Sequence, residues 1–274
     1  MTRITDVFQT AAAEQRMTFM PFVTAGDPSM DGTAAILKAL RDAGVDLIEL
    51  GFPYSDPIAD GPVIQASYTR ALNAGVTVPQ IFSMMESVKN EGLPPVLAMV
   101  SFAIIFRFGV EKFAERAAAV GFSGLIVPDL PVDEAEDMKA IAVRHGLDLV
   151  LLIAPTTTTA RTAAILKSST GFVYCVSVAG TTGVRRELPP ELSEQLRTLR
   201  ANTSLPLAVG FGISAPEQVA ALEGVADGII VGSGIVRLAE GKSADEAAKA
   251  VQEFASTMRA AVHQTRPSQA TAAK

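Results

Sequence analysis

Eight short apolar runs alternate along this chain with longer amphipathic runs, and this alternation constrains the fold more than any other feature. Each short run is apolar almost throughout, as is typical of parallel strands that are covered on both faces. The longer runs carry apolar residues at helical spacing, such as Ile36, Leu40 and Ala43. The predicted strands are residues 18–24, 46–50, 95–101, 124–128, 148–154, 171–178, 205–210 and 228–231.

Eight β/α units favour a closed (β/α)8 TIM barrel over an open sheet. The chain has 274 residues, and such barrels typically contain ~250. We expect an extra N-terminal helix over residues 4–15 and an inserted helix over residues 62–74, after the second strand. No linker divides the chain, so residues 1–263 are predicted to form a single barrel domain. Residues 264–274 are polar and contain a proline, which predicts a disordered C-terminal tail.

Charge and composition argue against several classes of protein. With 23 basic and 29 acidic side chains the net charge is −6, which argues against a nucleic-acid partner because a phosphate backbone requires a basic surface. Cys175 is the single cysteine, so an intramolecular disulfide is impossible and we expect a cytoplasmic protein. Residues 1–15 lack the apolar core of a signal peptide. The most apolar segment, residues 96–106, is too short to span a membrane, and we predict a buried strand that runs into a loop.

The active site of such a barrel forms at the carboxyl ends of the strands. Glycine-rich turns follow the last three predicted strands, at residues 179–183, 210–214 and 232–234. Their main-chain N–H groups can bind phosphate oxygens without a cationic side chain. A single Gly-x-Gly is as typical of an ordinary tight turn as of a phosphate-binding turn. Three such turns at neighbouring strand ends favour a phosphate site, so the barrel is predicted to be of the phosphate-binding type.

Carboxylates are concentrated after the second predicted strand. Glu49 ends an apolar run, where its charged form is poorly solvated, so it is a candidate acid/base group. Asp60 lies in the following Gly/Pro-rich loop and is either a second catalytic carboxylate or a turn former before Gly61. Tyr174, on the sixth predicted strand, faces either the site or the core. The histidines, 145 and 263, lie away from this face, so no metal site is predicted.

Five motifs together resemble the tryptophan synthase α chain family, in order along almost the whole chain. They are P-F-V-T-A-G-D-P at 21–28, E-L-G-F-P-Y-S-D-P-I-A-D-G-P-V-I-Q at 49–65, P-D-L-P at 128–131, G-F-G-I-S at 210–214 and G-S-G-I-V at 232–236. The resemblance implies a lyase that cleaves indole-3-glycerol phosphate to indole and glyceraldehyde 3-phosphate by a retro-aldol reaction. It also implies no cofactor in this chain, and a pyridoxal-phosphate-dependent β chain as partner in an αββα assembly.

The same motifs imply roles for individual residues. Glu49 would protonate C3 of the indole ring and remove the glycerol hydroxyl proton, Asp60 would stabilise the charged indole N–H, and Tyr174 would support Glu49. Asp56 would lie at the interface with the β chain. The implied phosphate-binding residues are Gly183, Gly212, Gly232 and Ser233, and the implied indole-pocket residues are Phe22, Ile64, Ile153 and Phe211.

One segment departs from the family pattern. Members usually carry a polar, tyrosine-containing stretch that ends in Asn-Pro after the third strand, where this chain has S-F-A-I-I-F at residues 101–106. Two alternatives therefore stay open: another phosphate-barrel enzyme, such as a sugar-phosphate isomerase or epimerase, and a non-catalytic subunit that activates a β chain. The missing histidine ligands argue against the metal-dependent isomerases, and the retained Glu49 and Asp60 argue against a non-catalytic subunit.

Overall fold

A computed structural model of the chain describes residues 2–57, 60–176, 190–210 and 212–268. Nine parallel strands form one sheet in the order β5-β4-β3-β2-β1-β9-β8-β7-β6. Their bounds are β1 Thr18–Thr24, β2 Ile48–Gly51, β3 Val96–Met99, β4 Phe122–Ile126, β5 Asp148–Val150, β6 Leu152–Ile153, β7 Val173–Val176, β8 Leu207–Gly210 and β9 Gly228–Val231.

The two strands at the ends of that order, β5 and β6, are separated only by Leu151. Together they occupy the single predicted strand at residues 148–154, so the sheet closes on itself through this one interrupted strand. The main-chain N–H of Tyr174 donates to the carbonyl oxygen of Leu151 at 3.2 Å across the interruption. The predicted (β/α)8 barrel is therefore confirmed, with one of its eight strands broken in two.

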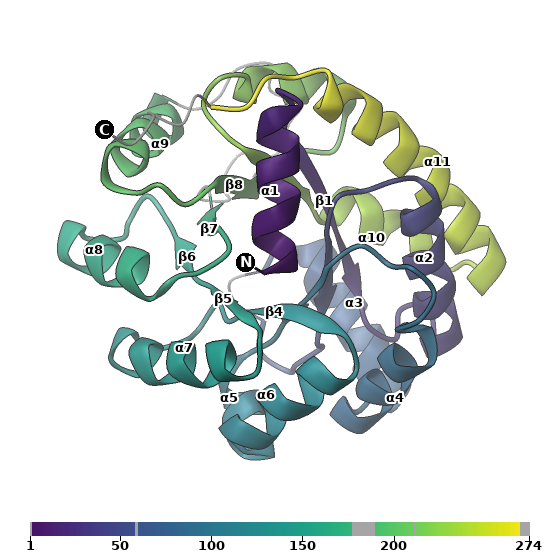
Figure 1. Ribbon diagram of the computed structural model, residues 1–274. Coiled ribbons are helices and arrows are strands. Elements are labelled where there is room, and N and C mark those ends of the chain that lie inside the picture. The colour runs from purple at the N-terminus through teal and green to yellow at the C-terminus, as the bar shows by residue number, and fades with distance from the viewer. Residues whose placement is uncertain (1, 58–59, 177–189, 211, 269–274) are drawn as a thin grey trace.

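Helices surround the ring of strands on the outside (Figure 1). Their bounds are α1 Arg3–Ala13, α2 Met30–Asp42, α3 Pro62–Asn73, α4 Val78–Val88, α5 Phe102–Phe108, α6 Val110–Ala119, α7 Ala135–Arg144, α8 Thr159–Ser168, α9 Pro190–Asn202, α10 Ser233–Ala239 and α11 Ala244–His263, with 3₁₀ turns at Val132–Glu134 and Pro216–Leu222. The helix α1 lies across the ring in Figure 1, and Ile4 and Phe8 pack against the inner barrel residues. The extra N-terminal helix therefore closes the end of the barrel at which the strands begin.

The segment 96–106 differs from the expected strand and loop. Strand β3 ends at Met99, and Ser101 begins α5 as its N-cap residue. The Ser101 hydroxyl donates to Asp129 Oδ2 at 2.6 Å, and the main-chain N–H of Phe102 donates to Asp129 Oδ1 at 2.7 Å. A carboxylate at a helix N-terminus satisfies main-chain N–H groups that have no partner within the helix. This apolar run therefore contains strand β3 and the beginning of helix α5, in place of a strand and a loop.

The predicted disordered tail needs a correction at its beginning. Ser268 is buried, and its main-chain N–H donates to the carbonyl oxygen of Ala226 at 2.9 Å. Its hydroxyl donates to Asp227 Oδ1 at 2.8 Å and lies 2.6 Å from Arg200 Nη2. Residues 264–268 thus pack on the barrel, because Ala226, Asp227 and Arg200 supply hydrogen-bond partners for Ser268. The rest of the predicted tail, residues 269–274, lies outside the described residues.

Within the described residues, no helix is both long enough and apolar enough to cross a membrane.

Candidate active site

Glu49 faces the interior of the barrel. Successive side chains of a strand point to opposite faces, and Leu47 lies in the inner core while Ile48 and Leu50 lie in the core beneath the helices. Glu49 falls on the same face as Leu47 and is fully buried. Neither oxygen of its carboxyl group has a hydrogen-bond partner within the described part of the chain. A carboxyl group buried in this way is costly unless it is neutral or meets a ligand.

The surroundings of Glu49 favour its protonated form. Burial raises the pKa of Glu49 well above its ordinary range, and the negative charge of Asp60 raises it further. Burial also raises the pKa of Asp60, but hydrogen bonding with the Tyr54 hydroxyl opposes this rise. The two carboxyl groups therefore differ in environment. Glu49 is fully buried without a hydrogen-bond partner among the described residues, and Asp60 is half-buried with a donor for its charged form.

All three tyrosines of the chain lie around these carboxyl groups. Burial raises the pKa of Tyr54 to about 12, and the charges of Asp60 and Asp129 contribute. The pKa of Tyr174 is raised by burial and then by the charges of Glu49 and Asp60. Burial raises the pKa of Tyr68 as well, and the charges of Asp60, Tyr54 and Glu49 contribute to that rise. The structure thus places Glu49, Asp60 and Tyr174 near one another, and Tyr54 and Tyr68 lie beside them.

An aromatic wall stands beside the two carboxyl groups. The ring centroids of Phe22 and Tyr68 are 6.5 Å apart, and those of Tyr54 and Tyr68 are 5.5 Å apart. Ile64 is buried in the same cluster. Phe22 pairs in register with Glu49 on the neighbouring strand, which places the wall next to the buried acid. The wall requires glycine at position 51, since an added Cβ there would lie 2.4 Å from Phe22 Cζ and 2.8 Å from Tyr68 Oη.

Of the described phosphate candidates, Gly232 lies close to this wall. Gly232 precedes α10, and Ser233 is the first residue of that helix. An added Cβ at Gly232 would lie 3.9 Å from both Ile64 Cδ1 and Phe22 Cβ. Gly212 has a φ of +50°, a conformation that favours glycine. Two further predicted residues, Gly183 and Phe211, lie outside the described residues.

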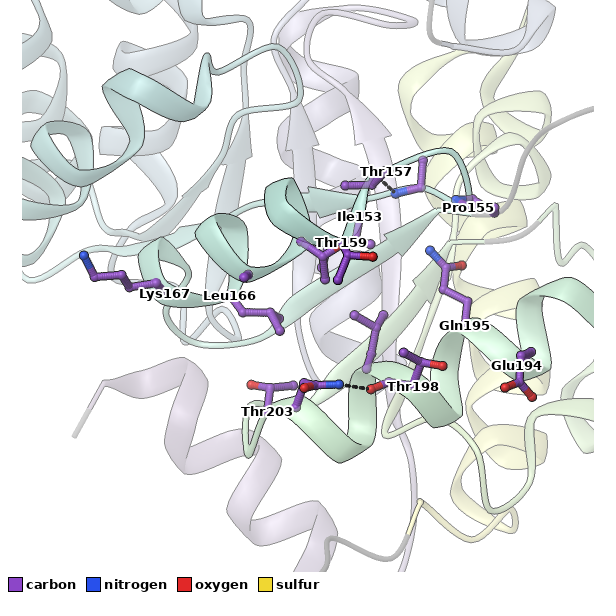
Figure 2. Close-up of a pocket in the computed structure, with 15 residues that line it drawn as sticks. Ile153, Pro155, Thr157, Thr159, Leu166, Lys167, Glu194, Gln195, Thr198 and Thr203 are labelled. Atoms are coloured by element: carbon purple, nitrogen blue, oxygen red, sulfur yellow. Dashed lines mark hydrogen bonds between the residues drawn. The ribbon is translucent and has the colours of Figure 1, made fainter.

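Ile153 does not face the barrel interior, and its assignment to the indole pocket needs a correction. Its register partner on β7 is Cys175, and both belong to the core beneath the helices. Leu152 pairs instead with Tyr174 and packs against the inner core. Ile153 lines a separate cavity of about 710 Å³ with residues of α8 and α9, as Figure 2 shows. A shift of one residue along a strand exchanges its two faces, so Leu152 is the inward-facing residue.

Two other predictions concern the surface and metal binding. Asp56 is exposed and accepts a hydrogen bond from the Ser55 hydroxyl at 2.8 Å, so it lies apart from the buried carboxyl group. The described residues contain no group of three His, Cys, Asp or Glu side chains that could hold a metal ion.

The environment of Glu49 predicts how stability depends on pH. Its folded-state pKa is raised, so between the ordinary glutamate value and that raised value the unfolded chain loses its proton first. The free energy of unfolding therefore falls as pH rises through this window. Glu49→Met is expected to remove that fall and to stabilise the fold by about 1–3 kcal/mol at neutral pH, the usual cost of an unpartnered buried polar group. Urea unfolding between pH 5 and 8 tests this, and parallel pH dependences for the two proteins would contradict it.

Comparison with known proteins gives consistent matches. The sequence model described as "Tryptophan synthase alpha chain" matches residues 8–263. The tryptophan synthase alpha chain of Rhodopirellula baltica is 48% identical, over 86% of this chain and 86% of its own length. That of a Picosynechococcus species is 45% identical, over 96% of this chain and 100% of its own.

Solved structures agree with these sequence matches. Mycobacterium tuberculosis tryptophan synthase in space group F222 is 34% identical with a TM-score of 0.87, over 96% of this chain and 98% of that one. The tryptophan synthase alpha chain from Legionella pneumophila is 34% identical with a TM-score of 0.85, over 96% of this chain and 97% of that one.

Proposed function

This chain belongs to the tryptophan synthase α chain family, and we propose that Glu49 and Asp60 are the catalytic pair of its reaction, with Glu49 as both acid and base and Asp60 as the group that stabilises the charged indole N–H. The chain is a lyase of tryptophan biosynthesis, which cleaves indole-3-glycerol phosphate to indole and D-glyceraldehyde 3-phosphate by a retro-aldol step. The observation that carries the proposal is the unpartnered, fully buried carboxyl group of Glu49 beside an aromatic wall and a second carboxyl group.

The proposed reaction uses the different protonation of the two groups. Protonated Glu49 donates its proton to C3 of the indole ring, and Asp60 stabilises the positive charge that develops at the indole N–H. Glu49, now ionised, accepts the proton of the glycerol hydroxyl group. The bond between C3 and the glycerol carbon then breaks, and its electron pair returns to the ring. Indole and an aldehyde result without any net gain or loss of protons or electrons. Tyr174 supports Glu49 from β7.

The substrate orientation that we propose follows from the surrounding groups. The indole ring lies against Phe22 and Ile64, with Leu152 in the role first assigned to Ile153. Phe211 is retained in this proposal on the family motif alone. The phosphate lies on the main-chain N–H groups of Gly212, Gly232 and Ser233, together with Gly183. Two observations support this phosphate position. Gly232 lies beside the aromatic wall, and the first main-chain N–H groups of a helix such as α10 have no partners within the helix.

The phosphate site predicts strong discrimination against a substrate without phosphate. Indole-3-glycerol lacks the anion that would anchor the substrate, so its kcat/KM is expected to be at least ~10²-fold lower, since binding energy from a remote group contributes to orientation. Indole release from both compounds measures this ratio. Equal kcat/KM values would contradict the phosphate assignment.

We also propose a partner and a location. A β chain that carries pyridoxal phosphate would receive the indole in an αββα assembly, while this chain itself would need no cofactor. The interface would include Asp56, and the exposure of Phe106, 71%, supports an adjoining apolar contact. A cytoplasmic location is consistent with the single, buried cysteine.

The direct test incubates the purified chain with indole-3-glycerol phosphate, alone and with a β chain, and measures indole. Cleavage by the isolated chain, increased by the β chain, is expected. If no indole forms under either condition while the β chain is activated, the chain would be a non-catalytic subunit and the proposed roles of Glu49 and Asp60 would be wrong.

A further inference from the structure

The side-chain amide of Gln65 joins α3 to the turn that carries Asp60. Its nitrogen, Nε2, donates to the carbonyl oxygen of Asp60 at 2.7 Å and to that of Pro57 at 3.2 Å. An amide nitrogen has two hydrogen atoms, so these two bonds use its full capacity as a donor. One side chain therefore holds both ends of the turn.

A main-chain hydrogen bond also joins Asp60 to Pro57. The N–H of Asp60 donates to the carbonyl oxygen of Pro57 at 3.0 Å. Immediately after the turn, the N–H of Gln65 donates to the carbonyl oxygen of Gly61 at 3.0 Å, within the first turn of α3. These main-chain bonds join Asp60 to Pro57 and stabilise the first turn of α3, while the Gln65 amide connects the two parts.

The helix α3 is itself firmly attached to the barrel. Tyr68 and Ile64 are buried in the aromatic cluster. Arg70 binds the buried carboxylate of Asp27 through two bonds, Nε to Oδ1 at 3.0 Å and Nη2 to Oδ2 at 2.8 Å. A bidentate pair of this kind fixes orientation as well as distance. Gln65 consequently transmits the position of a rigid helix to a loop that has few other attachments among its described residues.

We propose that Gln65 is a positioning residue for Asp60, holding the Asp60 carboxylate at the mouth of the barrel opposite Glu49. This inference rests on the proposed role of Asp60. Gln65 acts through the main chain and does not contact the reacting atoms. Glutamate at this position would place carboxylate oxygens against two carbonyl oxygens, so it would push away the turn that the amide holds.

The test compares Gln65→Glu and Gln65→Ala with wild type. A catalytic group displaced by about 1 Å can cost ~10²-fold in rate, so we expect kcat for indole release to fall about 10–100-fold, with a smaller change in KM. The matched control is Thr69→Ala, which removes the bond from the Thr69 hydroxyl to the carbonyl oxygen of Gln65, 2.9 Å long, one turn further along α3. This control keeps the Gln65 amide and is expected to retain wild-type turnover.

A pH profile separates positioning from a general loss of stability. Burial raises the pKa of Asp60 in the wild-type chain. A turn released towards water would lower that pKa, so the acid limb of kcat/KM is expected to move to lower pH in both Gln65 variants. Thermal unfolding of each variant shows that the assays were made on folded protein.

Asp60→Asn distinguishes failure of this inference from failure of the proposed function. Loss of activity in Asp60→Asn, together with reduced kcat and a shifted acid limb in the Gln65 variants, supports the inference. Loss of activity in Asp60→Asn with an unshifted pH profile or wild-type turnover in the Gln65 variants overturns the inference alone. Wild-type activity in Asp60→Asn overturns the proposed role of Asp60, and the inference fails with it.

Discussion

Replacement of Glu49 by glutamine is expected to lower kcat for the cleavage of indole-3-glycerol phosphate by about 10²–10⁴-fold, the usual contribution of a general acid or base. The amide has nearly the same size as the carboxyl group but cannot give a proton to C3 of indole. Burial raises the pKa of Glu49 and so favours its neutral carboxyl group, which the neutral amide resembles in charge. KM is therefore expected to change little, and steady-state indole release gives both constants.

The matched control for Glu49→Gln is Glu253→Gln, on an exposed position of α11. It makes the same chemical change away from the site and is expected to leave kcat unchanged. Far-UV circular dichroism and urea unfolding establish that both variants are folded. Turnover of Glu49→Gln within about threefold of wild type would contradict the assignment of Glu49 as the acid, since even the lower bound for such a group is ~10²-fold.

Replacement of Gly51 by alanine is expected to reduce kcat/KM by about 10²-fold, the effect of displacing positioned groups by about 1 Å. The added Cβ would lie 2.4 Å from Phe22 Cζ and 2.8 Å from Tyr68 Oη. Both rings are buried, so neither can rotate away into solvent. Overpacking of this kind is expected to lower the free energy of unfolding by about 1–3 kcal/mol. Indole release and urea unfolding measured on the same samples test both effects.

A second glycine gives the control for this steric argument. An added Cβ at Gly61 meets nothing within 4 Å, and the φ of Gly61 is −71°, which any residue adopts. Gly61→Ala is expected to cost less than about 1 kcal/mol, the scale of an N-cap preference. If Gly51→Ala resembled Gly61→Ala in both stability and activity, the aromatic wall would not depend on the absence of a side chain at position 51.

The inward direction of Glu49 was predictable because strand alternation is local. Residues 46–50 are apolar except at Asp46 and Glu49, so a carboxyl group at the strand end had to be buried. The start of α5 was not predictable in the same way. Its N-cap Ser101 is bound by Asp129, 28 positions further along the chain, and hydrophobic periodicity cannot detect a contact at that separation.

The aromatic wall was also only partly predictable from the sequence. Tyr68 lies on α3 and Tyr54 lies in the segment between β2 and α3, so their 5.5 Å ring contact is tertiary. The spacing of Ile64 and Tyr68, four residues apart on one helix face, was the available signal. The assignment of Ile153 to the indole pocket was wrong because it came from the family resemblance and not from alternation along the strand. Val150 and Leu152 lie in or against the inner core, whereas Leu151 and Ile153 lie in the core beneath the helices.

The most direct measurement is a ¹³C NMR titration of protein labelled at the glutamate side-chain carboxyl carbons, with Glu49→Gln used to assign the Glu49 resonance. The expected result is one resonance, absent from Glu49→Gln, that titrates at a pH well above the range of the exposed glutamates. Titration of the Glu49 resonance together with the exposed glutamates would mean that the group is ionised in the resting enzyme. A carboxylate of that kind has no proton to give to the indole ring, and the proposed mechanism would be wrong.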